Sequence, residues 1–218
     1  MNKKYKLFIF DFDGTLGDTK ECVVASFQKS LSHNNLSIAD RNKIIQLMGI
    51  SLPDVFRKLT HAKLDDAMYE KLVTDYRMFY KDFLVSKTQI FPDVAKTLKI
   101  LKEKKILCSI ATSKKTEFAI LSCKYLRIDT YIDFYIGDDM VTQKKPNPEM
   151  LTVTLKKLNI NKLDAVMIGD STFDIDMGNA IQMDTIAVTW GSHSLQLLKS
   201  ANPTYTINKF SELLQFVE

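Results

Sequence analysis

The sequence predicts an α/β fold in which helices cover both faces of a parallel sheet. Short apolar runs recur along its 218 residues, and longer amphipathic segments separate them. The runs show little alternation with polar residues, which is typical of strands buried on both faces. Residues 18–85 break this rhythm with several helical patterns and no convincing strand. Together these observations favour a parallel sheet that carries a helical insertion after its first strand.

Six apolar runs are the predicted strands, and turn or helix-start residues bound each of them. They cover residues 5–10, 106–111, 134–136, 165–168, 185–188 and 205–207. The insertion separates the first run from the second, whereas the later runs follow one another at the spacing of strand–helix units. The α/β core domain is therefore expected to combine residues 1–17 with residues 86–218.

The insertion predicts a small all-helical domain over residues 18–85. Its helices are expected at residues 21–31, 38–46, 52–59 and 64–83, with Asn34, Gly49 and Pro53 as breaks between them. In the last helix, apolar residues recur every three or four positions, as they do in an amphipathic helix (Leu64, Met68, Leu72, Tyr76, Phe79 and Phe83).

Composition and charge argue against several functional classes. Hydrophobic residues make up 45% of the chain and charged residues 26%, which is ordinary for a globular protein. The net charge of +4 comes from scattered lysine pairs without a basic run, so nucleic-acid binding is not expected. Most of these lysines are expected on the solvated surface, although a mild positive charge also suits a small anionic substrate.

The cysteines and the N-terminal segment indicate a cytoplasmic protein. Cys22, Cys108 and Cys123 are odd in number and far apart, which argues against a disulfide framework or a zinc knuckle. The apolar stretch at residues 7–10 is too short for an export signal or a membrane span, so no membrane partner is expected.

An acidic pair follows the first predicted strand. In the segment Asp11-Phe12-Asp13-Gly14-Thr15, both aspartates lie at the carboxyl end of a buried strand, where open α/β sheets bind their ligands. The two carboxylates are two residues apart and are expected to face one cleft, and Gly14 permits a sharp turn behind them. Such a pair repels itself, which raises the pKa of one carboxyl group or requires a cation. The alternative is a loop that merely carries surface acids.

The segment Asp-Phe-Asp-Gly-Thr-Leu at residues 11–16 resembles the first motif of the haloacid dehalogenase-like (HAD) hydrolase superfamily. The resemblance implies a Rossmann-like core with the HAD fold. It also implies that Asp11 is a nucleophile that becomes a transient aspartyl-phosphate. Asp13 would be the general acid and base for the leaving group and the incoming water, and its backbone carbonyl would bind a metal.

Two further motifs of the family are matched downstream, in order. Thr112 and Ser113 follow the second predicted strand, where a hydroxyl is placed to bind a phosphoryl oxygen. A helix N-cap is the structural alternative for Thr112. Lys145 opens a Lys-Pro-Asn-Pro run that resembles the third motif. The resemblance implies that Lys145 offsets the negative charge of Asp11 and of the transferring phosphoryl group, with Lys144 as the rival assignment.

The fourth motif lies at residues 166–174, where an apolar run again leads into acids. It resembles the metal-binding motif of the family through Asp170 and Asp174. The resemblance implies that Asp170 is a direct metal ligand and that Asp174 supports the metal, through water or by orienting the motif lysine. A helix cap at Asp170 or Ser171 is compatible with this assignment.

The charge balance of the four motifs favours a divalent cation. Asp11, Asp13, Asp170 and Asp174 bring four negative charges to one cleft, which Lys145 cannot balance alone once a phosphate ester is bound. Mg²⁺ suits oxygen ligands of this kind, so Asp11, Asp13 and Asp170 are the expected metal ligands. The histidines are far apart and are expected to be surface or core residues rather than zinc ligands (His33, His61 and His193).

Asp13 and the insertion narrow the expected chemistry. Members of the family that cleave carbon–halogen or carbon–phosphorus bonds usually lack the second aspartate, so Asp13 implies phosphate chemistry. The insertion resembles the helical cap of the subfamily with phosphoglycolate phosphatase, β-phosphoglucomutase and a bacterial inorganic pyrophosphatase, and such caps exclude water and select small phosphates. The run around Trp190 is most similar to the phosphoglycolate phosphatase-like group. Gly17 and Asp93 depart from that group, which usually has a larger residue and a glycine at these positions.

The leading hypothesis is therefore a Mg²⁺-dependent phosphatase that hydrolyses a small phosphomonoester such as 2-phosphoglycolate through an aspartyl-phosphate. Pyrophosphate hydrolysis and a β-phosphoglucomutase-like phosphotransfer are the enzymatic alternatives. A non-enzymatic binding module is an alternative of another class, which degraded motifs would favour, whereas all four motifs are intact. The expected partner is a small phosphorylated metabolite, bound by a monomer or a weak homodimer, and Arg77 and residues 49–51 are candidates to reach it from the insertion.

Overall fold

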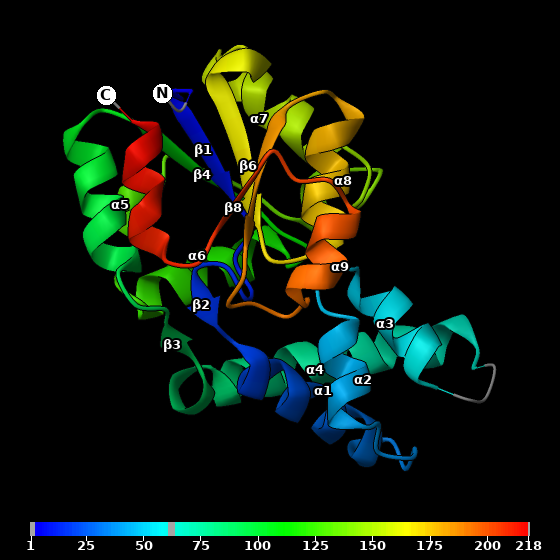
Figure 1. Cartoon of the computed structure of the whole chain (residues 1–218). Helices are drawn as coiled ribbons and strands as arrows, with labels where there is room; N and C mark the ends of the chain where they lie inside the picture. The colour runs from blue at the N-terminus through cyan, green and yellow to red at the C-terminus, as the bar shows by residue number, and fades with distance from the viewer. Residues whose placement is uncertain (1–2, 61–63, 218) are drawn as a thin grey trace.

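A computed structural model describes residues 3–60 and 64–217, and its sheet confirms the predicted fold class (Figure 1). Six strands pair in parallel in the order β5-β4-β1-β6-β7-β8, so β1 and β6 are central. Each predicted run contains one of these strands or most of it. Their bounds are β1 Leu7–Phe10, β4 Leu107–Ala111, β5 Phe134–Ile136, β6 Ala165–Gly169, β7 Asp184–Val188 and β8 Tyr205–Ile207.

Helices cover both faces of the sheet, which explains why the strands show little alternation between apolar and polar residues. Their bounds are α5 Val94–Glu103, α6 Thr116–Tyr125, α7 Glu149–Leu158, α8 Thr172–Ala180 and α9 Leu195–Ser200, with 3-10 helices η1 Asp129–Tyr131, η2 Asp138–Met140, η3 Lys162–Asp164 and η4 Phe210–Phe216. Phe8 and Phe10 share a hydrophobic cluster with residues of α5, α6 and η4. Leu7 and Ile9 point to the other face and share a cluster with residues of α7 and α8.

Four helices occupy the region in which the sequence predicts the insertion, and they lie beyond the carboxyl ends of the strands (Figure 1). They are α1 Lys20–His33, α2 Arg41–Gln46, α3 Leu52–Leu59 and α4 Asp66–Lys87. Helix α2 begins later than expected because the Asp40 side chain caps it by accepting a hydrogen bond from the Lys43 N–H. The helices share a hydrophobic cluster in which the Phe27 ring lies 4.5 Å from the Tyr76 ring, between centroids.

A short antiparallel ladder joins the two ends of the helical region. Strand β2 (Gly17–Asp18) pairs with β3 (Gln89–Ile90), so the chain enters and leaves the helices side by side. Two-residue strands carry no hydrophobic period, which is why the sequence does not predict them. Shortly after β3, Asp93 adopts a φ of 64°, the left-handed conformation that favours the glycine usual at this position.

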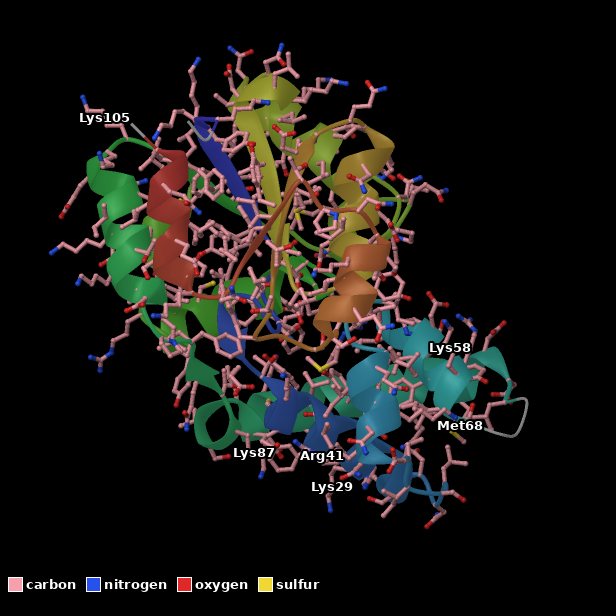
Figure 2. The ribbon with its side chains drawn as sticks, viewed as in Figure 1. Lys29, Arg41, Lys58, Met68, Lys87 and Lys105 are labelled. Atoms are coloured by element: carbon pink, nitrogen blue, oxygen red, sulfur yellow. The ribbon has the colours of Figure 1, made fainter. Side chains whose placement is uncertain are left out.

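The surface carries most of the basic charge, as expected from the scattered lysines. Figure 2 shows Lys29, Arg41 and Lys87 projecting outward from the helical region, and all three are exposed. Within residues 3–60 and 64–217, no helix combines the length and the apolar character that crossing a membrane requires.

Candidate active site

The candidate site forms at the carboxyl edge of the sheet, where three neighbouring strands end. Asp11 follows β1, Thr112 follows β4 and Asp170 follows β6. Because β1 pairs in parallel with both β4 and β6, these three side chains come to the same edge. The loop before α7 brings Lys145 to the same place, so segments far apart in the sequence meet there.

Lys145 joins two buried acids. Its Nζ donates hydrogen bonds to Asp11 Oδ1 at 2.8 Å and to Asp174 Oδ1 at 2.6 Å, and the lysine side chain is fully buried. Burial alone would lower the pKa of Lys145, but the two carboxylates outweigh burial and raise it, so the ammonium remains charged. Lys144, the rival assignment, instead donates to Asp138 Oδ2 at 3.0 Å.

Asp11, Asp170 and Asp174 form a compact group of buried carboxylates, with one oxygen from each within 4.8 Å of the others. Burial raises the pKa of Asp11 to about 8, against the attraction of Lys145 and with the added repulsion of Asp174, Asp170 and Asp13. Burial and the charge of Asp174 raise the pKa of Asp170 to about 6. One lysine therefore leaves the group short of positive charge. A group of oxygen ligands whose negative charge is not balanced by nearby cations suits a hard divalent cation.

Asp170 is held in place by the loop that follows β7. The N–H and the hydroxyl of Ser192 both donate to its Oδ2 at 2.6 Å, and the Thr15 hydroxyl donates to its Oδ1 at 3.4 Å. The backbone of Gly14 lies so close that a Cβ there would stand 2.2 Å from Asp170 Oδ2. Gly191 also lies close to this side chain, since a Cβ added to Gly191 would stand 2.1 Å from Asp170 Cβ. The loop and the glycines thus form a cradle around this carboxylate.

Asp174 divides its two oxygens between the lysine and the start of α8. While Oδ1 accepts from Lys145, Oδ2 accepts from the N–H and the hydroxyl of Ser171 at 3.1 Å and 2.7 Å. Ser171 occupies the N-cap position of α8, one of the two cap positions considered from the sequence. Asp174 therefore fixes the position of Lys145 relative to the helix.

Asp13 stands apart from the three buried carboxylates and pairs with Lys114, a residue for which no role was predicted. Its Oδ2 lies 2.6 Å from Lys114 Nζ, and its Oδ1 accepts from the Thr19 hydroxyl. Burial alone would lower the pKa of Lys114, but Asp13 outweighs burial and raises it. Lys114 Nζ also lies 4.3 Å from the centre of the Tyr80 ring. The site therefore holds a second cation besides the buried Lys145, and the side chain of this second lysine is only 10% exposed.

Thr112 and Ser113 follow β4, and their hydroxyls have different partners. Thr112 Oγ1 accepts from the Lys114 N–H at 3.3 Å, and Lys115 rather than Thr112 precedes α6, so Thr112 is not the N-cap. The Ser113 hydroxyl donates to Gly49 O at 2.6 Å, which links the loop after β4 to the helical region.

The histidines do not join the carboxylates as ligands in the described part of the chain. His193 is buried, and its Nδ1 accepts from the Thr172 N–H at 3.1 Å. His33 is exposed and stacks edge-on against Phe79. His61 lies outside the described residues.

A cavity opens onto the candidate site between the sheet edge and the helical region. Its empty volume is about 620 Å³, a figure that includes solvent at its open mouth. Asp11, Asp13, Thr112, Ser113 and Lys114 line one side of this "Asp11 cavity", and residues of α1, α3 and α4 line the other. Asp11 and Asp13 therefore face one cleft, as their spacing indicates.

Several residues of the site carried no usable signal in the sequence. Ser192 reaches Asp170 from a loop 22 positions further along the chain, and no motif marks it. Thr15 and Thr19 are ordinary hydroxyls near a turn. Of these residues, Lys114 would have been the easiest to predict, because it directly follows Thr112 and Ser113.

Comparison with known proteins gives consistent matches over nearly the whole chain. The family model for haloacid dehalogenase-like hydrolases matches residues 8–188. The chain is 31% identical over 210 residues to the probable phosphatase IndB of Dickeya dadantii, a match that covers 95% of this chain and 91% of that protein. It is 31% identical over 212 residues to pyrophosphatase PpaX of Bacillus pumilus, covering 96% and 94%. A solved haloacid dehalogenase-like family hydrolase of Streptococcus pneumoniae superposes with a TM-score of 0.85 at 25% identity, covering 97% of this chain and 98% of that one.

Proposed function

The chain belongs to the haloacid dehalogenase-like hydrolase family, and on that premise we propose that it is a phosphatase that hydrolyses a small phosphomonoester with Asp11 as its nucleophile. The position of Asp11 carries the proposal. The carboxylate follows the central strand β1, lines the Asp11 cavity and is bound through Oδ1 by Lys145 at 2.8 Å. An acid so placed is both held by a cation and accessible to a ligand.

In the proposed reaction, the Asp11 carboxylate attacks phosphorus and the ester bond breaks, which leaves an aspartyl-phosphate. Asp13 gives a proton to the departing oxygen. Asp13 then takes a proton from a water molecule, whose oxygen attacks phosphorus and releases inorganic phosphate and the Asp11 carboxylate. Thr112 and Ser113 would bind phosphoryl oxygens, and Lys145 would offset the charge that gathers at the reacting centre.

Mg²⁺ is the proposed cofactor. Asp11, the backbone carbonyl of Asp13 and Asp170 would hold it, and Asp174 would support it by keeping Lys145 in place. The bound cation would neutralise the carboxylates and the phosphoryl oxygens. The compact group of buried carboxylates, which one lysine leaves short of positive charge, supports this choice.

Residues 18–85 would act as a cap over a core made of residues 1–17 and 86–218. Two observations support this division. The helical region and the sheet edge line opposite sides of the Asp11 cavity, and the β2–β3 ladder brings the two connecting segments together. A cap in this position would exclude water from the reacting phosphoryl group.

Two specific substrates follow from different observations. The resemblance of the Trp190 region favours 2-phosphoglycolate, whereas the relatives named pyrophosphatase PpaX favour pyrophosphate as a second candidate. A β-phosphoglucomutase-like phosphotransfer is the remaining enzymatic alternative, and no residue described here favours it.

The proposal is tested by release of inorganic phosphate from p-nitrophenyl phosphate. We expect release with Mg²⁺, loss of release with excess chelator, and recovery when Mg²⁺ is restored. Asp11→Asn is expected to lower the rate to background while the protein remains folded by circular dichroism. Asp66→Asn is the matched control, because that side chain is 96% exposed at the start of α4. Undiminished release by Asp11→Asn would overturn the nucleophile assignment.

A further inference from the structure

One side of the Asp11 cavity is polar and the opposite side is mainly apolar. The sheet edge and the loop after β4 supply the polar side, with Asp11, Asp13, Thr112, Ser113, Lys114 and Lys115. The helical region supplies mainly apolar and aromatic side chains, among them Val23 and Phe27 from α1, Leu52 and Val55 from α3, and Tyr76 and Tyr80 from α4. A bound molecule would therefore meet charge at one end and hydrocarbon at the other.

Cations on the polar side gather around the place proposed for the phosphoryl group. Lys114 Nζ lies 2.6 Å from Asp13 Oδ2, and Lys145 is shared between Asp11 and Asp174. Both ammonium groups are thus matched by acids next to the reacting centre. Lys114 lies at the boundary with the apolar side, since its Nζ is 4.3 Å from the centre of the Tyr80 ring, but its charge is already paired with Asp13.

The apolar side offers little to a second charged group. Among the described lining residues of the helical region, Arg77 alone is charged. Arg77 also lines a separate hollow on the outside of α4 together with Lys81 and Glu117, so it stands at the margin of the cavity. The Tyr80 hydroxyl is already hydrogen-bonded to Ser122 Oγ at 3.2 Å.

Building on the proposed function, we infer that the leaving group of the substrate is an apolar alcohol, alkyl or aryl, rather than a second anionic group. A carboxylate or a second phosphate that packed against Phe27, Leu52 and Val55 would lose its bound water, and these three side chains offer no hydrogen-bond donor in return. Such a loss is unfavourable. A hydrocarbon chain would instead gain from each methylene that it buries there. This chemistry argues against both 2-phosphoglycolate and pyrophosphate as the preferred substrate.

The test uses ethyl, butyl and hexyl phosphate, whose leaving alcohols are chemically alike, beside 2-phosphoglycolate and pyrophosphate. We expect kcat/KM to rise by about fourfold per methylene while the chain remains inside the cavity. We expect 2-phosphoglycolate and pyrophosphate to be at least about tenfold poorer than hexyl phosphate. A flat chain-length series, or a preference for either anion, would overturn the inference and would point to Arg77 as an anion-binding residue.

Substitutions of residues that line the Asp11 cavity test where the hydrocarbon chain binds. Leu52→Lys places a cation on the apolar side at a half-buried position, and it is expected to flatten the chain-length series. Leu195→Lys is the matched control, because Leu195 is 42% exposed on α9 and does not line the cavity. The control is expected to keep the wild-type series. An unchanged series in Leu52→Lys would overturn the inference, and Ile50→Ala gives a second, milder readout at a neighbouring lining residue.

Binding measurements separate this inference from the proposed function. Alkylphosphonates carry the same chains on a carbon–phosphorus bond, so calorimetry reports their affinity without turnover. Affinity that rises with chain length supports the apolar site even if no ester is hydrolysed, an outcome that would overturn the phosphatase proposal alone. Hydrolysis of the esters with no dependence of phosphonate affinity on chain length would overturn the inference alone.

Discussion

Replacing Gly14 with alanine tests whether the cradle around Asp170 is as tight as its geometry indicates. Gly14 has a φ of 81°, and a Cβ added there would stand 2.2 Å from Asp170 Oδ2 and 2.7 Å from its Cγ. Alanine at this backbone angle costs about 1–2 kcal/mol. The collision can be relieved only if Asp170 moves away from the Ser192 N–H and hydroxyl, and each hydrogen bond to a charged group contributes about 1.5–3 kcal/mol.

The loss of one such hydrogen bond and the cost of the backbone angle together give an expected decrease of about 2.5–5 kcal/mol in the free energy of unfolding. Denaturant unfolding in the presence of chelator measures it. Gly17→Ala, at the start of β2, is the matched control, since a Cβ added there would come no closer than 3.3 Å to the Phe12 ring. We expect the control to cost less than about 1 kcal/mol.

A double-mutant cycle isolates the contact with Asp170. In an Asp170→Ala background, Gly14→Ala should cost only the backbone term of about 1–2 kcal/mol. An equal penalty in both backgrounds would show that the carboxylate is not the obstacle. A cost below about 1 kcal/mol in the wild-type background would refute the whole argument from crowding.

Lys145→Met is expected to lower the free energy of unfolding by about 3–5 kcal/mol, because it leaves Asp11 and Asp174 buried without their cation. Lys99→Met, whose ion pair with Glu103 is exposed on both sides, should cost less than about 1 kcal/mol, and similar losses in the two variants would contradict this reasoning. Burial alone would raise the pKa of Asp184, but hydrogen bonds from Lys3 and Tyr5 lower it, so its ionised form stabilises the fold above about pH 4 and loses that contribution as pH falls. The difference in unfolding free energy between Asp184→Asn and wild type should therefore be present at pH 7 and shrink as the pH falls below about 4, and a pH-independent difference would count against this linkage.

The strands could be predicted because their signal is local. A strand covered on both faces must be apolar at each position, so Phe8 and Leu7 mark β1 equally although they enter different clusters. The helices were placed nearly as well, with ends displaced where a side chain such as Asp40 caps the first turn. The β2–β3 ladder was missed because its pairing depends on how the helical region returns to the sheet.

The candidate site could be predicted in part. The contacts that were missed join residues that lie far apart in the sequence or that no motif marks. Motif order brought Asp11, Asp170 and Lys145 to one place, and the structure puts Lys145, rather than Lys144, on Asp11. The charge count from the sequence omitted Lys114, because nothing local shows that its ammonium meets Asp13. Ser192 could not be found either, since its bond to Asp170 depends on the path of a loop.

The placement of β1 also bears on how the protein is made. Strand β1 leaves the ribosome before both of its partners in the sheet, because β4 and β6 follow the whole helical region. Lys145 meets Asp11 across 134 positions of sequence. The helices can therefore gather their own apolar cluster early, while β1 waits as an exposed apolar strand for most of synthesis. An unfinished chain would consequently have no assembled active site and would be prone to aggregate, which gives the nascent protein a need for protection during translation.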